Sequence, residues 1–145
     1  MSKQPALTHD EMLNFLEEVF PQVFVVEKTL ALDAVGWGKG QITLDVNDKH
    51  LRPGGTVSGP TMMMMADCAA YICVLSVIGK VALAVTTNLN INFLRKPPET
   101  ALTCISTPLK IGKSLFVTEC KIFAADDPEQ KLVAHATATY SIPPK

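Results

Sequence analysis

The sequence has no excess of charge of either sign, since 13 basic and 14 acidic side chains among 145 residues give a formal net charge of -1. Long runs of like charge are missing as well. Nucleic-acid-binding proteins usually carry a basic patch or stripe, which this balance does not provide. We therefore expect no nucleic-acid partner.

Cysteine is scarce, and its spacing is not that of a metal or redox site. The four cysteines form neither a CxxC pair nor a zinc-finger pattern, and each falls within an apolar or strand-like run. We interpret them as reduced core residues: Cys68, Cys73, Cys104 and Cys120. The three histidines show no spacing typical of a metal pair or a catalytic dyad. The sequence thus predicts neither a metal site nor a cofactor.

An apolar secretory core is missing from the first eleven residues, which are mostly polar. The sequence therefore predicts no signal peptide, and a cytoplasmic location follows as the expectation.

The chain does contain 48% apolar residues, enough for one sizeable core, and its length fits a single domain over residues 1–145. An amphipathic helix is expected at about residues 8–20, where Thr8 and Glu11 form a capping box. Pro21 ends this helix. The β-branched residues that follow predict a first strand over residues 23–32.

Alternating apolar and polar residues predict a further strand around residues 42–46 and another around 89–93. Three more strands are expected at about residues 100–107, 114–124 and 131–142. The short turns between them are typical of antiparallel connections.

The segment from about residue 61 to 78 is the most unusual, because residues 62–78 carry one charge in 17 positions. A membrane span is the competing interpretation, but the segment is short, contains Asp67 near its centre and explains none of the strands. We expect a buried helix that ends at Gly79, and no membrane segment. A helix that is apolar all round needs a curved antiparallel sheet wrapped around it and a partner to cover the rest. The predicted class is therefore α+β, with the hotdog fold and a short N-terminal helix.

Asp67 is the first candidate for chemistry, because a lone carboxylate among apolar helix residues is rarely buried without a partner or a task. The plain alternative is a carboxylate that pairs with a nearby donor. Ser58, Gly59 and Pro60 predict the start of the same helix, whose free amides are suited to stabilising an oxyanion. Asp67 lies eight residues beyond Gly59, or about 12 Å along the axis. If both groups act on one carbonyl, they belong to different subunits of a dimer.

A thioester suits a site with so few groups, because the thiolate is a good leaving group and needs little help from an acid. The carboxylate can act as a general base on water or as a nucleophile, and the sequence does not distinguish these routes.

The pattern of Gly55, Gly59 and Asp67, together with the strand TTNLNINFLRKP, resembles the PaaI-type branch of the hotdog thioesterases, in the 4-hydroxybenzoyl-CoA thioesterase-like superfamily. The similarity covers roughly residues 30–142. It implies that Asp67 is the catalytic carboxylate, that the Gly59 amide binds the thioester carbonyl, and that the Thr86 hydroxyl holds the attacking water. A threonine with a purely structural role in its strand is the alternative for Thr86. The resemblance also implies CoA as part of the substrate, with no separate cofactor, and a dimer or a tetramer built from dimers.

Three positions depart from that pattern: Arg52 replaces an Asn, Ser58 replaces a His and Pro60 replaces a Gly. Pro60 has no N–H and removes one candidate donor. Arg52 can contact the carbonyl or a CoA phosphate, or can remain a solvated loop residue. The predicted substrate-binding residues are Arg52, Gly55, Ser58, Tyr71, Arg95, Lys96 and Lys113, with the last three as cations for CoA phosphates and Tyr71 shaping the pocket next to Asp67.

The leading hypothesis is an acyl-CoA thioesterase. A non-catalytic acyl-CoA-binding hotdog protein is one alternative, and it would tolerate loss of the carboxylate. An enoyl-thioester hydratase is another, but it would be expected to place a histidine in the helix region, where this sequence has none.

Overall fold

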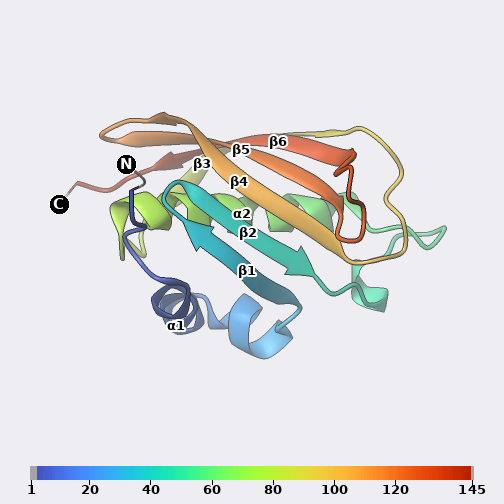
Figure 1. The fold of residues 1–145 in the computed structure, drawn as a ribbon. Helices are drawn as coiled ribbons and strands as arrows, with labels where there is room; N and C mark the ends of the chain where they lie inside the picture. The colour runs from blue at the N-terminus through green and yellow to red at the C-terminus, as the bar shows by residue number, and fades with distance from the viewer. Residues whose placement is uncertain (1–2, 145) are drawn as a thin grey trace.

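The computed structural model describes residues 3–144, which form one long helix, a six-stranded sheet and shorter helical segments (Figure 1). In chain order the elements are α1 (His9–Val19), the π-helical η1 (Gln22–Glu27), β1 (Leu30–Gly36), β2 (Lys39–Leu44), the 3-10 turn η2 (Asp48–His50), α2 (Gly59–Ile78), β3 (Val85–Phe93), β4 (Leu102–Ile111), β5 (Leu115–Ala124) and β6 (Leu132–Ser141).

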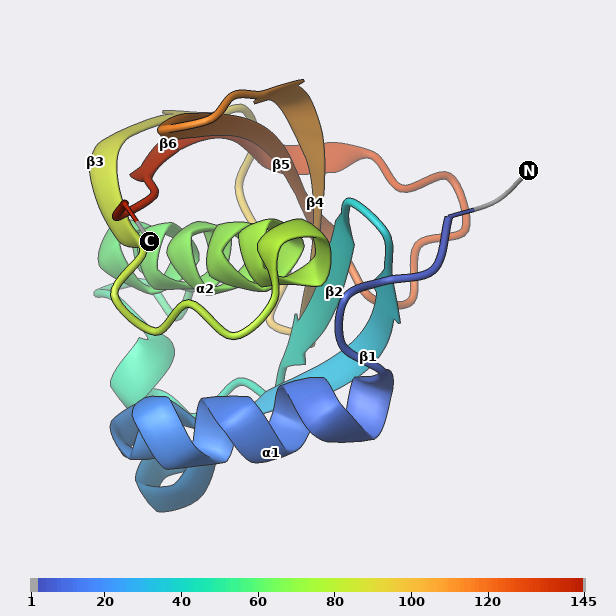
Figure 2. The same cartoon turned by 90° about the vertical axis from the view of Figure 1, so that its left-hand side faces the viewer.

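The strands form one antiparallel sheet in the order β1-β2-β4-β5-β6-β3, so that β1 and β3 are its two edges. The sheet curves around α2, and α1 lies near β1 at one side (Figure 2). This arrangement confirms the predicted α+β hotdog fold.

Small residues allow α2 to lie close to the sheet. A Cβ atom at Gly40 of β2 would come within 2.8 Å of Ile72 and 2.9 Å of the Ala69 carbonyl, so only glycine fits there. On β6 the inward positions of the strand carry Ala134, Ala136 and Ala138, all fully buried. The helix is thereby held against the middle of the sheet. Helix α2 is long and apolar enough to cross a membrane, but 72% of its most apolar stretch is buried within the domain, as in the core helix of a globular fold.

The predicted first strand over residues 23–32 is wrong in its first half, because residues 22–27 are π-helical and the strand begins at Leu30. Pro21 continues with helical backbone angles, and the Phe24 amide donates to the Phe20 carbonyl at 3.2 Å. Val25 and Val26 are exposed by 49% and 78%. Their strand preference reflects packing on a half-buried sheet, and no such surface is available to them here.

Helix α2 begins two residues before the predicted residue 61, at Gly59. Ser58 caps it, since its hydroxyl accepts a hydrogen bond from the Thr61 amide at 3.3 Å, and Pro60 lies in the first turn, where its missing N–H costs nothing.

The two edges of the sheet differ in how they are covered. Helix α1 has the predicted capping box and buries Met12, Phe15 and Leu16. At the β1 edge, His9 lies 2.6 Å from the Leu32 carbonyl through its Nε2 atom. At the β3 edge, no strand of residues 3–144 pairs with the outer side of β3. An uncovered strand of nine residues is a ready site for pairing with another chain.

Candidate active site

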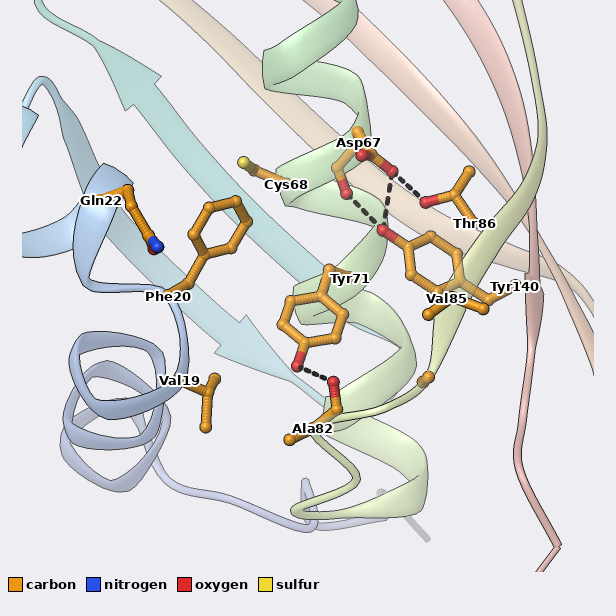
Figure 3. Close-up of a pocket in the computed structure, with 11 residues that line it drawn as sticks. Val19, Phe20, Gln22, Asp67, Cys68, Tyr71, Ala82, Val85, Thr86 and Tyr140 are labelled. Atoms are coloured by element: carbon orange, nitrogen blue, oxygen red, sulfur yellow. Dashed lines mark hydrogen bonds between the residues drawn. The ribbon is translucent and has the colours of Figure 1, made fainter.

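A pocket of about 360 Å³ opens beside Asp67, between α2 and the segment that leads into β3 (Figure 3). Its walls come from five parts of the chain: the junction of α1 and η1, the outer face of α2, the loop that follows α2, the start of β3 and the end of β6. The residues that line it are Val19, Phe20, Gln22, Asp67, Cys68, Tyr71, Ala82, Ala84, Val85, Thr86 and Tyr140. Of these, Asp67 is the one carboxylate.

One oxygen of the Asp67 carboxylate is fixed by two hydroxyl groups. Oδ1 accepts hydrogen bonds from Thr86 at 2.5 Å and from Tyr140 at 2.8 Å, and the Tyr140 hydroxyl also lies 2.9 Å from the Asp67 carbonyl (Figure 3). Oδ2 has no hydrogen bond to any residue between 3 and 144, and it is not among the buried unpaired atoms. The carboxylate is thus held in one orientation with one oxygen free to react.

The two tyrosines of the pocket are neutral proton donors. Burial raises the pKa of Tyr140, and the neighbouring Asp67 carboxylate raises it further. Burial also raises the pKa of Tyr71, whose hydroxyl donates to the Ala82 carbonyl at 3.0 Å. The two rings are stacked with centroids 6.0 Å apart. Cys68, next to Asp67, is not a nucleophile at neutral pH, because burial raises the pKa of its thiol to about 12.

A second pocket of about 500 Å³ lies at the start of α2, away from Asp67. It contains four of the residues singled out in the sequence, Gly59, Arg52, Arg95 and Lys96, together with Met62, Phe93 and Leu94. Arg52 and Lys96 are exposed, and Arg95 donates from Nε to the Leu132 carbonyl at 3.1 Å. One chain therefore keeps its carboxylate and its predicted oxyanion donor in different pockets.

Gly59 supplies the one free amide of the first helical turn. Thr61 donates its amide to the Ser58 hydroxyl and Met62 donates to the Ser58 carbonyl at 3.2 Å, while Pro60 has no amide hydrogen. The Gly59 amide makes no hydrogen bond within the part of the chain that the structure describes. It carries the positive end of a 20-residue helix.

The remaining predicted residues lie elsewhere. Ser58 is the cap of α2, and Gly55 belongs to the preceding loop, where φ is +81° and a Cβ atom would collide with Glu99. Lys113 lies in the turn between β4 and β5 and lines a third pocket with Ile78 and Ile142. It is therefore not grouped with Arg95 and Lys96 in the same chain.

Of the residues that line the Asp67 pocket, sequence reasoning identified Asp67, Tyr71 and Thr86 and missed the others, among them Tyr140 and Phe20. Tyr140 follows Ala134, Ala136 and Ala138 at the same two-residue spacing, so it is the large polar residue that ends the inward row of β6. This two-residue spacing could have identified Tyr140 from the sequence. No sequence pattern identifies Phe20, because its position depends on the path of the chain after Pro21.

The three histidines lie outside this pocket. His135 lies 3.1 Å from Glu119, and His50 accepts from the Asn47 amide at 3.0 Å. Between residues 3 and 144, no group of three or more His, Cys, Asp or Glu side chains is placed to hold a metal ion.

A curved sheet around an apolar helix, with one oriented carboxylate on that helix, defines a hotdog-fold protein with a candidate hydrolytic site. The chain belongs to the thioesterase superfamily, whose family model matches residues 54–131. No match was found among the curated proteins.

Solved structures agree with this family. A protein of Silicibacter sp. TM1040 with a proposed thioesterase function is 40% identical, over 99% of this chain and 97% of its own, with a TM-score of 0.86. Zebra fish thioesterase superfamily member 2 is 17% identical over 94% of this chain and 99% of its own, with a TM-score of 0.82. A mutant of the phenylacetic acid degradation protein PaaI from Thermus thermophilus is 19% identical over 83% of this chain and 98% of its own, with a TM-score of 0.71. The last two show the shared fold, and the family as a whole supports a thioester hydrolase.

Proposed function

We propose that this protein hydrolyses acyl-CoA thioesters and that Asp67 is its catalytic carboxylate. The observation that carries the proposal is the orientation of this carboxylate, with Oδ1 fixed by two hydroxyl groups and Oδ2 free in a pocket with largely apolar walls. A free carboxylate oxygen in such a pocket can take a proton from water or attack the thioester carbonyl itself. In either route CoA leaves as the thiolate, and neither a metal nor a cofactor takes part.

The proposed enzyme is a dimer paired along β3, and the position of the pockets on this strand supports it. β3 contributes Val85 and Thr86 at its start to the Asp67 pocket, and Phe93 at its end to the Gly59 pocket. If two copies of β3 pair antiparallel, the start of one lies beside the end of the other. Each Asp67 pocket is then joined to the partner's Gly59 pocket.

Exposed apolar side chains along this edge support the same pairing. Val85, Phe93 and Leu94 are exposed by 54%, 50% and 55% in the single chain. Pairing of two β3 strands would bury apolar surface there and satisfy the open backbone groups of the edge. Two such dimers can further combine into a tetramer.

In the proposed mechanism, the partner's Gly59 amide donates to the carbonyl oxygen of the thioester as negative charge develops on it. The positive end of the partner's α2 adds to this stabilisation. Arg52, Arg95 and Lys96 surround the Gly59 pocket, so the phosphates of CoA are expected on that side, where cations can bind them. The acyl group then enters the apolar Asp67 pocket.

A hydrolysis screen tests the proposed function. The protein is incubated with acetyl-, butanoyl-, octanoyl-, palmitoyl- and phenylacetyl-CoA, and release of free CoA is followed with a thiol reagent. We expect hydrolysis of at least one of them. If all five remain intact while the protein binds them in a calorimeter, the protein is an acyl-CoA-binding protein and the proposal is wrong.

Removing the two hydroxyl donors of Asp67 is expected to lower kcat while leaving the pocket in place. A hydrogen bond to a charged group contributes about 1.5–3 kcal/mol. Thr86→Val and Tyr140→Phe should therefore each lower kcat by about tenfold or more, with little change in KM. Thr86→Ser keeps the hydroxyl and should recover most of the lost rate. A kcat that is kept in Thr86→Val but lowered in Thr86→Ser would mean that Thr86 acts through packing alone, because Val keeps the shape of Thr and Ser does not.

A further inference from the structure

The wall of the Asp67 pocket opposite β3 is built by the N-terminal segment, which has no assigned role in the proposed chemistry. Val19, Phe20 and Gln22 line the pocket from the junction of α1 and η1. In Figure 3 these three residues lie on one side of Tyr71, whereas Thr86 and Tyr140 lie on the other. The pocket therefore has a catalytic wall and a second wall that carries no reacting group.

The second wall is fixed in place by its backbone. The Phe20 amide donates to the Leu16 carbonyl at 2.8 Å, and the Phe20 carbonyl accepts from Val23 at 3.3 Å and from Phe24 at 3.2 Å. The rings of Phe20 and Phe24 also meet edge to face, with centroids 6.2 Å apart. Phe24 and Leu16 are buried in the core. The Phe20 backbone is thus held in place, and its ring packs against a residue of the core.

The pocket is also short in the direction along α2. Asp67 and Tyr71 are one helical turn apart, which is about 6 Å along α2. Beyond Tyr71 the pocket is lined by Ala82 and Ala84, and the Tyr71 hydroxyl donates a hydrogen bond to the Ala82 carbonyl at 3.0 Å. The volume of about 360 Å³ is near the lower limit for pockets that enclose a small ligand.

We propose that the α1–η1 junction determines acyl-chain length, with Phe20 and Val19 as the specificity-determining residues. The preferred substrates are then acyl groups of short to medium length, and long chains are excluded by the Phe20 ring. This inference rests on the proposed thioesterase function of the same pocket. Phe20 and Val19 touch the acyl group and take no part in the bond-breaking step.

The assignment is tested by comparing the kinetics of acyl-CoAs of different chain length in two variants, one that enlarges the pocket and one that fills it. Wild type, Phe20→Ala and Val19→Phe are assayed with butanoyl-, octanoyl- and palmitoyl-CoA, all below the micellar concentration of palmitoyl-CoA. In wild type kcat/KM should be highest for butanoyl- or octanoyl-CoA. Phe20→Ala should raise the ratio of palmitoyl to octanoyl hydrolysis by about tenfold, because the removed ring opens the pocket. Val19→Phe fills the pocket and should shift the preference towards butanoyl-CoA.

Val26→Ala is the matched control, because Val26 lies on η1 but is 78% exposed and does not line this pocket. Its chain-length profile should equal that of wild type. If Phe20→Ala is too unstable to assay, Val19→Phe decides alone. An active wild type whose chain-length ratios do not change in the variants overturns the inference and leaves the thioesterase intact. A wild type that hydrolyses none of the substrates overturns both.

Discussion

Replacing Asp67 by Asn is expected to lower kcat for thioester hydrolysis by about a thousandfold, since a positioned general base contributes roughly 10²–10⁴-fold. Asn has nearly the same shape, and its carbonyl oxygen can accept the hydrogen bonds that Thr86 and Tyr140 donate to Oδ1. The substitution therefore replaces only Oδ2, the oxygen that is proposed to react, with an amide nitrogen. KM should change little, because the lost interaction is formed mainly in the transition state.

Asp33→Asn is a suitable control for this experiment. It makes the same chemical change at an exposed carboxylate that accepts a hydrogen bond from Thr43 on the neighbouring strand and lies outside the Asp67 pocket. Its kcat should equal that of wild type. If Asp67→Asn keeps wild-type turnover, Asp67 is a structural residue and another group must activate the water.

Periodicity made most of the fold predictable, because it reports directly on burial. The unbroken apolar run of α2 indicates a helix surrounded by protein on all sides, and the alternation at Leu89, Ile91 and Phe93 indicates a strand. Helix α2 was found within two residues of its predicted bounds, whereas β3 ends at the predicted Phe93 but begins four residues earlier than predicted, at Val85. The error at residues 23–27 has a different origin, because β-branched residues favour a strand only where a neighbouring strand offers a packing surface.

The site was predictable only in part. Asp67 and Gly59 stand out because one is a charge in an apolar run and the other precedes a proline at a helix start. Tyr140 and Phe20 are 73 and 47 residues away from Asp67 in sequence, and they reach it only through the curvature of the sheet and the π-helical segment after Pro21. Contacts between residues so far apart in sequence leave no local sequence pattern. Tyr140 is the exception, because the alternation of residues along its strand places its side chain on the inward face of the sheet.

Leu89→Pro is expected to give a monomer that has lost thioesterase activity, while Leu89→Ala remains a dimer. The Leu94 amide donates to the Val133 carbonyl of β6, so alternation along the strand turns the amides of Asn92 and Asn90 towards β6 as well. The amides of Ile91 and Leu89 then face the open edge. Proline at Leu89 removes one outward N–H without breaking a bond to β6.

The paired variants separate backbone pairing from side-chain packing. Both lose the Leu89 side chain, which is partly buried against the core, but only Leu89→Pro loses the amide. Analytical ultracentrifugation should report a monomer for Leu89→Pro and a dimer for Leu89→Ala. Without the partner's Gly59 amide, the monomer should hydrolyse acyl-CoA about 10²–10³-fold more slowly, the usual effect of losing one oxyanion donor. A Leu89→Pro monomer that keeps full activity would show that each chain holds a complete site, and Asp67 would then have to work with a donor from its own chain.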